Sequence, residues 1–418
     1  KTYVPDNNFE AYLEIEGWGD GIPNNDSVIT ANISSLTTLI IDNTSISNLT
    51  GIEDFTALTY LNVSYNSLSG VLNLSTLTNL NYLNCSSNYG LTGLDLSNNP
   101  SLERLICKNN NGITSLDLTS CPNLEDANLF DLSLTSINVT GLVFLQDLNV
   151  GGYSPGSSNQ LTTIDVSTNI ALTDLDVGNN YLTTLDVSNN PHLYQLWLEN
   201  NQITSLDLTN NMSLRYLVLN DNNLTSLTVP SPNIKWLRAA NNSLTSVSFT
   251  STEVEDLQVQ NNQITSLDVS HCIDLEEFDC RNNQIDSLDL SSSDGSLIEF
   301  NCSNNNLVSL DLRFNIASNS YGALTGPNFS ATGNPNLTCI DVVNVGWANL
   351  YWSSSVDAGA SFSVYCNPPP GLVLGCMDPT SSNYNAAATY DDGSCYYLVP
   401  KTYVPDNNFE AYLEIEGW

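Results

Sequence analysis

Leu193–Ser213 (LYQLWLENNQITSLDLTNNMS) is one full period of a pattern that occupies most of the chain, and this pattern limits the fold more than any other feature. Apolar residues alternate in each half of the period, and each half ends in an asparagine, Asn201 or Asn211. Alternation is strand periodicity and asparagine is a turn residue, so one period predicts two strands and two corners. A unit of this size cannot bury its apolar side alone, and the pattern therefore predicts a solenoid of stacked copies.

The first half of this period begins thirteen times along the chain. Neighbouring copies start 20 to 22 residues apart, except for a step of 27 that contains Gly151–Ser158. The glycine, proline and serine content of that insertion predicts a loop, which is either a contact loop or a tolerated surface loop on one corner. The thirteen copies start at Leu36, Leu58, Leu80, Leu102, Leu124, Leu145, Leu172, Leu193, Leu214, Ile234, Val254, Leu275 and Leu297.

The pattern resembles the leucine-rich-repeat family. Residues 36–57 (LTTLIIDNTSISNLTGIEDFTA) are similar to the repeats of bacterial internalin-like surface proteins, and residues 275–294 (LEEFDCRNNQIDSLDLSSSD) resemble the arrays of secreted bacterial surface proteins. The resemblance implies a mostly β solenoid with parallel ladders and little helix, on a protein that is secreted or held at the cell surface. It also implies a binding or structural surface rather than an enzyme.

Stacked copies predict ladders of equivalent residues about 4.8 Å apart. An asparagine ladder occupies the first corner, where its amides can bond the backbone groups that a turn leaves free. We therefore expect a structural role for it, with irregular corners at Thr44 and Leu132, where the pattern lapses. The ladder consists of Asn66, Asn88, Asn110, Asn180, Asn201, Asn222, Asn242, Asn262, Asn283 and Asn305.

A second ladder is acidic and lies between inward apolar residues of the second strand, so its side chains are expected to point outward. Like charges at this spacing repel by about 1 kcal/mol per pair even in water. The row is either a strip for divalent cations or a solvated face whose charge opposes aggregation. It consists of Asp95, Asp117, Asp165, Asp186, Asp207, Asp268, Asp289 and Asp311, with interruptions at Asn138, Thr228 and Ser248.

The outward residues of the first strand form the candidate binding surface, because in leucine-rich-repeat proteins this strand normally lines the concave face. Trp197, Tyr216 and Trp236 come from consecutive repeats and are expected to form one exposed aromatic patch, with Arg238 beside it. Exposed aromatic residues next to a scarce arginine are typical of interface anchors. These four residues are the predicted partner-binding site, and mutual stacking without a ligand is the alternative.

The N-terminal residues predict a helical cap that closes the open end of the stack. Pro5–Asn8 supplies breaker and N-cap chemistry, and the residues that then share one helical face are Phe9, Tyr12, Leu13 and Glu16. The polar segment Gly19–Asp26 predicts a turn, with a cation site as the alternative.

Near the C-terminus the repeat register fails after Arg313. Residues 314–366 resemble the closing segment of secreted leucine-rich arrays, and this resemblance implies a cap stapled by Cys339 and Cys366. The proline-rich residues 367–374 predict a stiff linker and a domain boundary.

Residues 375–397 predict a small module with a cysteine near each end. A segment of this size needs a covalent staple, so we expect a disulfide between Cys376 and Cys395. The module also carries oxygen donors suited to Ca²⁺, although their spacing is not that of an EF-hand loop. These donors are Asp378, Asn383, Asn385, Asp391 and Asp392. Calcium is the one cofactor that the sequence leaves open, and none is required.

The remaining six cysteines predict no metal site, because no Cys-x-x-Cys occurs. Four of them take inward positions of the first strand and are expected to be buried thiols that act as small hydrophobic residues. The other two occupy equivalent corners far apart, so no bond is expected between them. The inward four are Cys85, Cys107, Cys280 and Cys302, and the corner two are Cys121 and Cys272.

The charge of the chain excludes several classes of partner. With 45 acidic and 9 basic residues the formal net charge is −36, which repels nucleic-acid backbones and anionic lipid. No uninterrupted apolar run approaches about 18 residues, so membrane insertion is not expected. His192 and His271 lack the partners that hydrolytic chemistry needs, and we predict that the chain is not an enzyme.

Residues 401–418 repeat residues 1–18 letter for letter, KTYVPDNNFEAYLEIEGW, which gives the chain a second period of 400 residues. Together with a start at Lys1 that lacks a methionine or signal peptide, this predicts one unit of a giant tandem protein, with an artificial overlap as the alternative. The leading hypothesis is a structural and adhesive unit of an extracellular filament that contacts other copies of the same protein. The alternative is an adhesin that binds a target-cell protein or glycan on its concave face.

The predicted organisation has six parts. They are an N-terminal helical cap (1–35), a solenoid of thirteen repeats of about 21 residues (36–313), a C-terminal cap (314–366), a linker (367–374), a disulfide module (375–397), and a linker with the start of the next unit (398–418).

Overall fold

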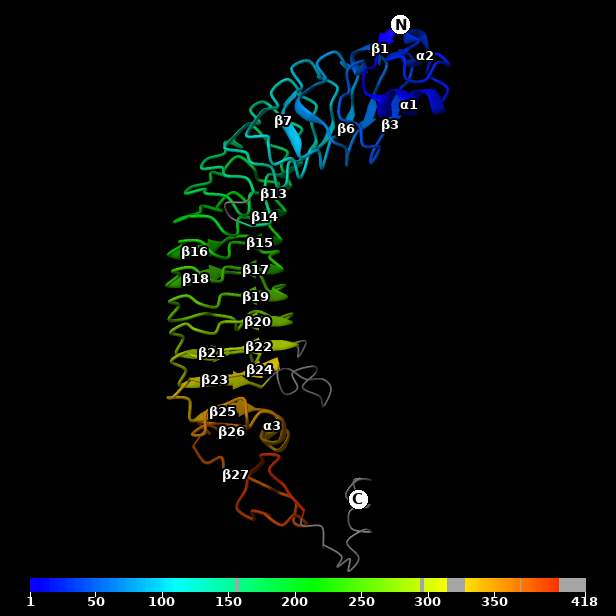
Figure 1. Ribbon diagram of the computed structural model, residues 1–418. Helices are drawn as coiled ribbons and strands as arrows, with labels where there is room; N and C mark the ends of the chain where they lie inside the picture. The colour runs from blue at the N-terminus through cyan, green and yellow to red at the C-terminus, as the bar shows by residue number, and fades with distance from the viewer. Residues whose placement is uncertain (155–157, 294–296, 314–327, 369, 398–418) are drawn as a thin grey trace, which may run out of the picture.

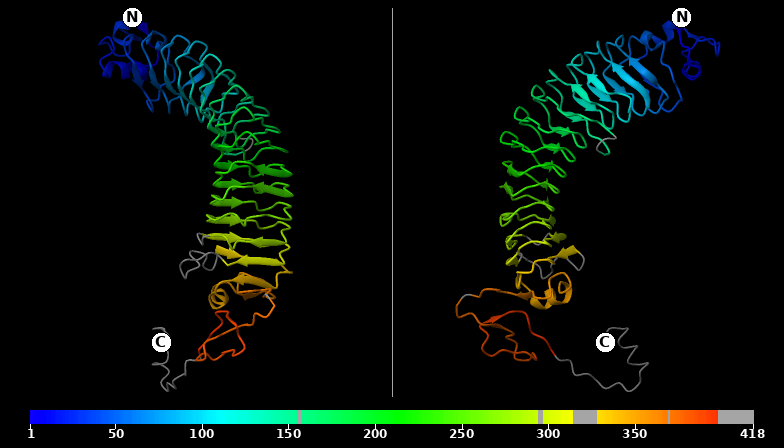
Figure 2. Two further views of the ribbon diagram at one scale, coloured as in Figure 1. Left: turned by 180° about the vertical axis from the view of Figure 1, so that it is seen from behind. Right: turned by 60° about the vertical axis from the view of Figure 1, so that its left-hand side comes forward.

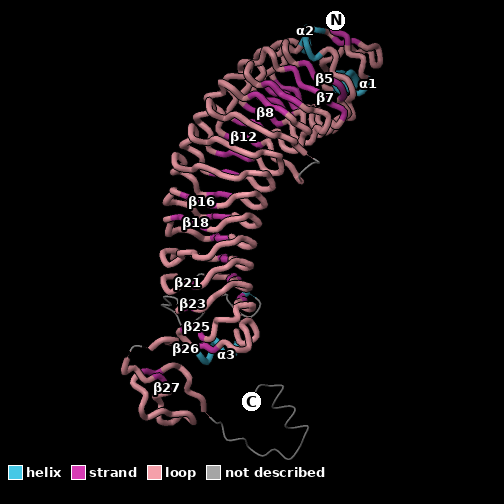
Figure 3. The backbone as a smooth tube through the Cα atoms, turned by 90° about the vertical axis from the view of Figure 1, so that its left-hand side faces the viewer, coloured by secondary structure: helices cyan, strands magenta, loops and turns pink. Residues whose placement is uncertain are grey.

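The computed structural model describes residues 1–154, 158–293, 297–313, 328–368 and 370–397. These residues form a curved solenoid of stacked rungs, with the N-terminus at one end and a small module beyond the other (Figure 1). The three α-helices of the described chain lie at the two ends of the solenoid (Figure 3). Within the same residues, no helix has the length and apolar character needed to cross a membrane.

One parallel sheet of fourteen strands lines the concave side of the curve (Figure 1). Its strands pair residue for residue; Leu196, for example, pairs with Leu175 on one side and Leu217 on the other. In the three-residue strands the middle residue points inward and its neighbours point outward, as strand alternation requires. The strands are β3 (Thr38–Ile40), β4 (Tyr60–Asn62), β6 (Tyr82–Asn84), β8 (Arg104–Ile106), β10 (Asp126–Asn128), β12 (Asp147–Asn149), β13 (Asp174–Asp176), β14 (Gln195–Trp197), β15 (Tyr216–Val218), β17 (Trp236–Arg238), β19 (Asp256–Gln258), β20 (Glu277–Asp279), β22 (Glu299–Asn301) and β24 (Phe329–Ser330).

The second half of each repeat lies on the convex side and pairs less regularly (Figure 2). Among the described residues it forms four short parallel sheets rather than one. Rungs splay on the outer side of a curved stack, which lengthens the distance that a backbone hydrogen bond must span. The half-repeat Ile203–Leu208 is therefore not a strand, although Ile203 and Leu208 are buried. The convex strands are β5 (Ser69–Asn73), β7 (Gly90–Asp95), β9 (Ser115–Asp117), β11 (Ser136–Asn138), β16 (Ser226–Val229), β18 (Ser246–Phe249), β21 (Ser287–Asp289), β23 (Ser309–Leu312), β25 (Cys339–Val342) and β26 (Ser361–Ser363).

A single hydrophobic core runs through the stack, from Val4 in the N-terminal cap to Phe362 near the other end. Each rung contributes the inward residues of both halves, such as Leu196 from the first and Leu208 from the second, and relies on the rungs above and below to cover them. The six cysteines outside the C-terminal region are free and buried, which confirms the burial expected for the four inward ones and the absence of a bond between Cys121 and Cys272.

The predicted asparagine ladder lines the first corner inside the stack. In one rung, Nδ2 of Asn201 donates to the carbonyl oxygens of Val177 (3.0 Å) and Leu198 (3.1 Å), and its Oδ1 accepts the backbone N–H of Leu182 at 2.9 Å. Each amide thus joins its own rung to the preceding one and satisfies backbone groups that the corner would leave unpaired.

Two further members of this ladder were missed in the sequence, and both follow insertions. Asn159 lies after the Gly151–Ser158 loop, and its Nδ2 donates to Leu129 and Val150. Asn334 is fully buried and donates to Cys302. In both cases the extra residues shift the spacing by which the other members were found.

The residue before most ladder asparagines has a left-handed backbone, which explains why the motif contains two adjacent asparagines. The φ angles of Asn241, Asn261, Asn282 and Asn304 lie between 55° and 58°, a region that short polar side chains tolerate. These side chains point outward and form a second amide ladder, in which Asn304 donates to Asn282 at 2.8 Å and Asn282 to Asn261 at 2.6 Å.

The prediction that the register fails after Arg313 is wrong. Strand β24 pairs with β22 as the last strand of the concave sheet, and β25 and β26 extend the convex sheet from β23. Phe329 pairs with Phe300, which lies 29 residues earlier, whereas most neighbouring rungs are 20 to 22 residues apart; this longer step hid the last rung in the sequence. Helix α3 (Val345–Tyr351) then closes the stack, with Trp352 fully buried against Phe329.

The opposite end is closed by the expected N-terminal helix, α1 (Asn7–Ile15). Asp6 caps it, and its Oδ1 accepts the backbone N–H groups of the next turn at 3.0 Å. Phe9 stacks on Phe55 inside the core with ring centroids 6.0 Å apart. Glu16 was expected within the helix on the same face as these residues, but it is the C-cap that follows the helix and is exposed, whereas Glu10 is buried. The cap also contains β1 (Thr2–Tyr3), β2 (Ser27–Val28) and α2 (Thr30–Ile33), followed by a 3-10 helix (Ile52–Asp54).

Candidate functional site

The concave sheet presents two outward rows of side chains, and these rows form the candidate binding surface. Row 1 contains the first residue of each three-residue concave strand, and row 2 contains the third residue. The two rows lie about 6.7 Å apart along the strand direction, and equivalent residues of neighbouring rungs lie about 4.8 Å apart. A ligand in the concave curve would therefore meet a regular two-row surface.

An aromatic patch lies in row 1 on β15 and β17. Tyr216 and Trp236 meet edge to face with ring centroids 5.1 Å apart, and Tyr194, the residue before β14, meets Tyr216 at 5.4 Å. The guanidinium of Arg238 lies 4.6 Å from the centre of the Trp236 ring, and its Nε donates to Asp256 at 2.9 Å. These rings are pre-ordered and partly open to solvent, which are the properties of an interface anchor.

Trp197 does not belong to this patch, so the predicted single cluster of three aromatic residues is wrong. Trp197 is the third residue of β14 and lies in row 2, where it pairs with Val218 and with Asp176. Tyr216 and Trp236 are first residues and lie in row 1. The sequence shows that all three point outward but does not separate the rows. Tyr194 was missed because it precedes the strand.

Trp197 instead forms one wall of a small acidic pocket. The pocket has a volume of about 250 Å³ and is lined by Trp197, Gln195 and three aspartates of β12 and β13. Burial raises the pKa of Asp176 within it, and burial likewise raises the pKa of Glu199, which follows Trp197 by two residues. The pocket combines an aromatic wall with carboxylates, a combination suited to a cationic group.

The same acidic character continues along row 1, where Asp126, Asp147 and Asp174 occupy three adjacent rungs. Burial and the carboxylates of Asp126 and Asp174 raise the pKa of Asp147 to about 6. Nε of Arg104 lies 2.9 Å from Asp126 and offsets part of the charge. Like charges at paired positions destabilise a sheet, so this stretch is suited to a partner with basic groups.

The acidic ladder on the convex side has a structural role that neither sequence interpretation included. Oδ1 of Asp207 accepts the backbone N–H of Thr209 at 2.9 Å, and Oδ1 of Asp186 accepts that of Ser188 at 2.9 Å. Hydrogen bonds from the side chains and backbones of Thr209 and Ser188 lower the pKa of the two carboxyls. The carboxylates thus satisfy backbone N–H groups at the second corner of the repeat. The charge of the convex face follows from this structural role.

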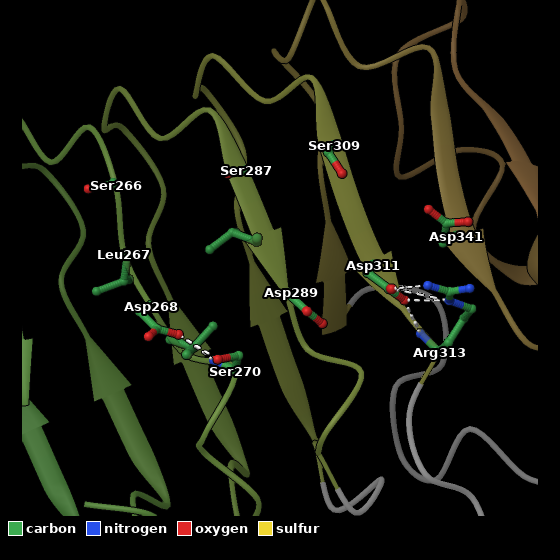
Figure 4. A pocket seen from close by; sticks show the side chains of 12 residues that line it. Ser266, Leu267, Asp268, Ser270, Ser287, Asp289, Ser309, Asp311, Arg313 and Asp341 are labelled. Carbon is green, nitrogen blue, oxygen red and sulfur yellow. Dashed lines mark hydrogen bonds and ion pairs between the residues drawn. The ribbon is translucent and has the colours of Figure 1, made fainter. Parts of the chain in front are cut away.

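Figure 4 shows the C-terminal end of this row, where Asp268, Asp289 and Asp311 line a pocket of about 540 Å³. Arg313 pairs with Asp311 and lies with its guanidinium 5.1 Å from the Tyr365 ring. One cation therefore joins the acidic row to the C-terminal cap.

Both expected disulfides are present in the C-terminal region. Cys339 and Cys366 have Cα atoms 5.7 Å apart, and Cys376 and Cys395 have Cα atoms 4.8 Å apart. The second bond closes the small module, which also contains a two-residue strand pair, β27 (Leu374–Gly375) and β28 (Tyr390–Asp391).

The five candidate calcium ligands of this module are hydrogen-bonded to the module itself. Oδ1 of Asp378 accepts the backbone N–H of Thr380 at 2.8 Å, and Oδ1 of Asp392 accepts that of Ser394 at 2.9 Å. In the part of the chain that the structure describes, no group of three or more His, Cys, Asp or Glu side chains is arranged to hold a metal ion. Calcium binding here stays a prediction for Asp378, Asn383, Asn385, Asp391 and Asp392.

The N-terminal segment Gly19–Asp26 folds as a turn around one carboxylate. Asp20 accepts hydrogen bonds from the side chains of Lys1, Asn25 and Ser27. The bond from Lys1 makes the largest contribution to holding the pKa of Asp20 well below its usual range. The Lys1 ammonium therefore supplies the positive charge beside this carboxylate.

Comparison with known proteins shows which solved structures the chain is similar to. No protein-family model matches the sequence, and no curated protein matches it. Among solved structures, the functional domain of InlJ from Listeria monocytogenes is 29% identical, with a TM-score of 0.61 over 82% of this chain and 76% of that chain. The chain has the leucine-rich-repeat fold and is similar to this internalin domain. YopM from Yersinia pestis shares the fold of this internalin-like protein at 23% identity, with a TM-score of 0.52 over 69% of this chain and 74% of that one.

The InlJ domain is described as including a cysteine ladder. The internalin-like chain has two short cysteine ladders of its own. Cys85 and Cys107 each come directly after the last residue of two adjacent paired strands, and Cys280 and Cys302 take the same positions further along the stack. A hydrogen bond with Cys107 and burial raise the pKa of Cys85, and burial raises that of Cys280. These thiols fill the core as hydrophobic residues and are not reactive groups.

Proposed function

We propose that this internalin-like chain is one structural and adhesive unit of a giant extracellular protein that forms a cell-surface filament or appendage. The fold is that of a protein-interaction or adhesion scaffold. The observation that carries the proposal is the second copy of residues 1–18 at residues 401–418. In the first copy this sequence forms a cap helix, and such a helix is useful only where another solenoid follows. Two disulfides support an oxidising, extracellular location.

Electron microscopy of native source cells tests this function. Gold-labelled antibodies raised against residues 1–397 are expected to mark an extended structure at many regularly spaced points. Label that is confined to single points near the cell surface, or to the cell interior, would contradict the proposed filament.

A second function is favoured by the concave face. We propose that it binds a protein or glycan through Tyr216, Trp236 and Arg238, with Trp197 contacting the same partner from row 2. The support is a pre-ordered aromatic patch next to the acidic stretch around Asp147, which favours a partner that carries basic groups. The two functions are compatible, because many weak sites on one array gain avidity.

Attachment of fluorescently labelled protein to source and neighbouring cells tests the concave site. A Tyr216→Ala/Trp236→Ala variant is expected to lose about 30-fold or more in apparent affinity, as truncation of two anchors commonly costs 2 kcal/mol or more. Trp197→Ala measures the contribution of row 2. Tyr89→Ala is the matched control, because Tyr89 is an exposed aromatic residue outside both rows. Equal attachment of the double variant and this control would exclude the concave patch as the binding site.

A further inference from the structure

We propose that the stapled module of one unit packs against the N-terminal cap of the unit that follows it in the chain, and so fixes the angle between successive solenoids. The stapled module is the segment of residues 375–397 closed by the Cys376–Cys395 disulfide. The partner surface is a second copy of the cap formed by residues 1–35. The inference rests on the proposed function, since it requires units that are joined end to end.

The length of the connection brings the two surfaces together. Tyr397 is the last described residue of the module, and Lys401 begins the second copy of the cap sequence. Four steps of chain reach at most about 14 Å, whatever path they take. Because Lys1 belongs to the cap in the first copy, the following cap must begin within that distance of Tyr397. The stapled module of one unit and the N-terminal cap of the next unit are therefore close enough to be in contact.

The module is anchored to its own solenoid, so its orientation can be transmitted. Tyr390 of the module meets Tyr365 of the C-terminal cap edge to face, with centroids 5.4 Å apart. Arg313 covers the same Tyr365 ring and pairs with Asp311 of the solenoid. The contacts thus run without a gap from β23 to the module, which lies beyond α3 at the end of the stack (Figure 3).

The module also presents more aromatic surface than it uses for its own folding. It contributes no residue to the hydrophobic core, and within it only Gly375, Cys376 and Ser381 are buried. Exposed apolar and aromatic surface that is concentrated on so small a segment is typical of an interface. The exposed aromatic residues are Tyr384, Tyr390, Tyr396 and Tyr397, each between 42% and 55% accessible.

The cap carries an uncovered apolar surface of its own. In the first copy, α1 buries Phe9 and Leu13 against the solenoid but leaves Ile15 82% exposed, and Tyr3 of β1 is 60% exposed. Ile415 and Tyr403 are the same residues in the second copy. A tethered contact needs little buried area to persist, because the linker supplies a high effective concentration. The tyrosines of the module and this isoleucine are the complementary surfaces.

The test measures the distance between two units in a chain that contains two of them in natural sequence order. Spin labels on one exposed site in each solenoid report this distance by pulsed electron paramagnetic resonance. The wild type is expected to show one narrow distance distribution. Tyr384→Ser/Tyr396→Ser in the first unit, and separately Ile415→Ser in the second cap, are expected to lose the narrow component. Tyr89→Ser, a change at an exposed tyrosine of the first solenoid, is expected to retain it.

A control on folding makes the outcome decisive. Intact-mass analysis under alkylating conditions must show the Cys376–Cys395 bond in each variant, so that a broad distribution is not the result of an unfolded module. A broad distribution in the wild type, or narrow ones in both interface variants, would overturn the packing. Either of these results would be compatible with the proposed tandem array, whereas a native polypeptide that contains a single unit would contradict the array itself.

Discussion

Asn222→Ala is expected to destabilise the solenoid by about 3 kcal/mol, because the asparagine ladder satisfies buried backbone groups. The Asn222 side chain is nearly inaccessible, its Nδ2 donates to Leu198 at 2.9 Å, and its Oδ1 accepts the backbone N–H of Ile203 at 2.9 Å. Removal of the amide leaves the buried N–H of Ile203 without its acceptor, and the carbonyl oxygens of Leu198 and Leu219 each lose one of two amide donors. The unsatisfied N–H costs about 1–3 kcal/mol, and each lost hydrogen bond costs about 0.5–1.5 kcal/mol.

Asn222→Asp separates the role of the donor from that of side-chain size. The replacement keeps one oxygen acceptor but places a second oxygen where Nδ2 faces the carbonyl groups of Leu198 and Leu219. We therefore expect it to destabilise the protein at least as much as alanine does at pH 7. Asn223→Ala is the matched control, since Asn223 is exposed and surface changes of this kind stay within about 0.5 kcal/mol.

Urea unfolding followed by circular dichroism gives the change in the free energy of unfolding. Amide hydrogen exchange at Ile203 adds a local measurement, because that N–H loses its acceptor in the alanine variant. A stability loss under about 0.5 kcal/mol, together with unchanged exchange at Ile203, would refute the structural role assigned to the ladder.

Three further predictions concern backbone strain, thiol burial and pH. Asn304 has a φ of 55°, so Asn304→Val is expected to lose about 1–2 kcal/mol in urea unfolding while Asn304→Gly stays near the wild type; equal losses would contradict this. The six free cysteines are buried, and burial raises the pKa of Cys121 to about 11 and that of Cys272 to about 12, so a thiol reagent should label none of the six before unfolding and all of them afterwards. Because the pKa of Asp147 is raised to about 6 in the folded chain, folding favours its protonated form and the wild type loses stability as pH rises from about 4 to 7. At pH 7, Asp147→Asn should therefore have a higher melting temperature than the wild type, and its free energy of unfolding should be larger by at most about 1 kcal/mol, because solvent screens this site. Below about pH 4 the two proteins should have the same melting temperature. A lower melting temperature for the variant at pH 7 would contradict the assignment.

The parts of the fold that the sequence predicts are those encoded within one period. Alternating leucines place the core, and the ladder asparagines recur at a fixed position, so Asn201 and its equivalents are found without a structure. Asn159 and Asn334 were missed because the residues inserted before them break the spacing, although both make the same hydrogen bonds as the other members. Short-range periodicity cannot detect a rung that is interrupted by a long insertion.

The candidate site was predicted less well, because its arrangement depends on which outward row a residue occupies. Alternation shows that Trp197 and Tyr216 both face outward, but their positions relative to the strand pairing place them in different rows. The acidic ladder shows a related limit. Sequence spacing gives the repulsion between neighbouring aspartates, whereas the hydrogen bond from Thr209 to Asp207 that offsets it depends on the turn that follows.

The length of the native polypeptide tests the central claim of a tandem array most directly. Sequencing of the complete reading frame, together with the mass of the protein isolated from its source, gives this length. The account predicts several consecutive 400-residue units, each beginning with a segment like residues 1–18 and ending with a stapled module. A polypeptide with one solenoid, in which no second set of repeats follows residue 418, would contradict it.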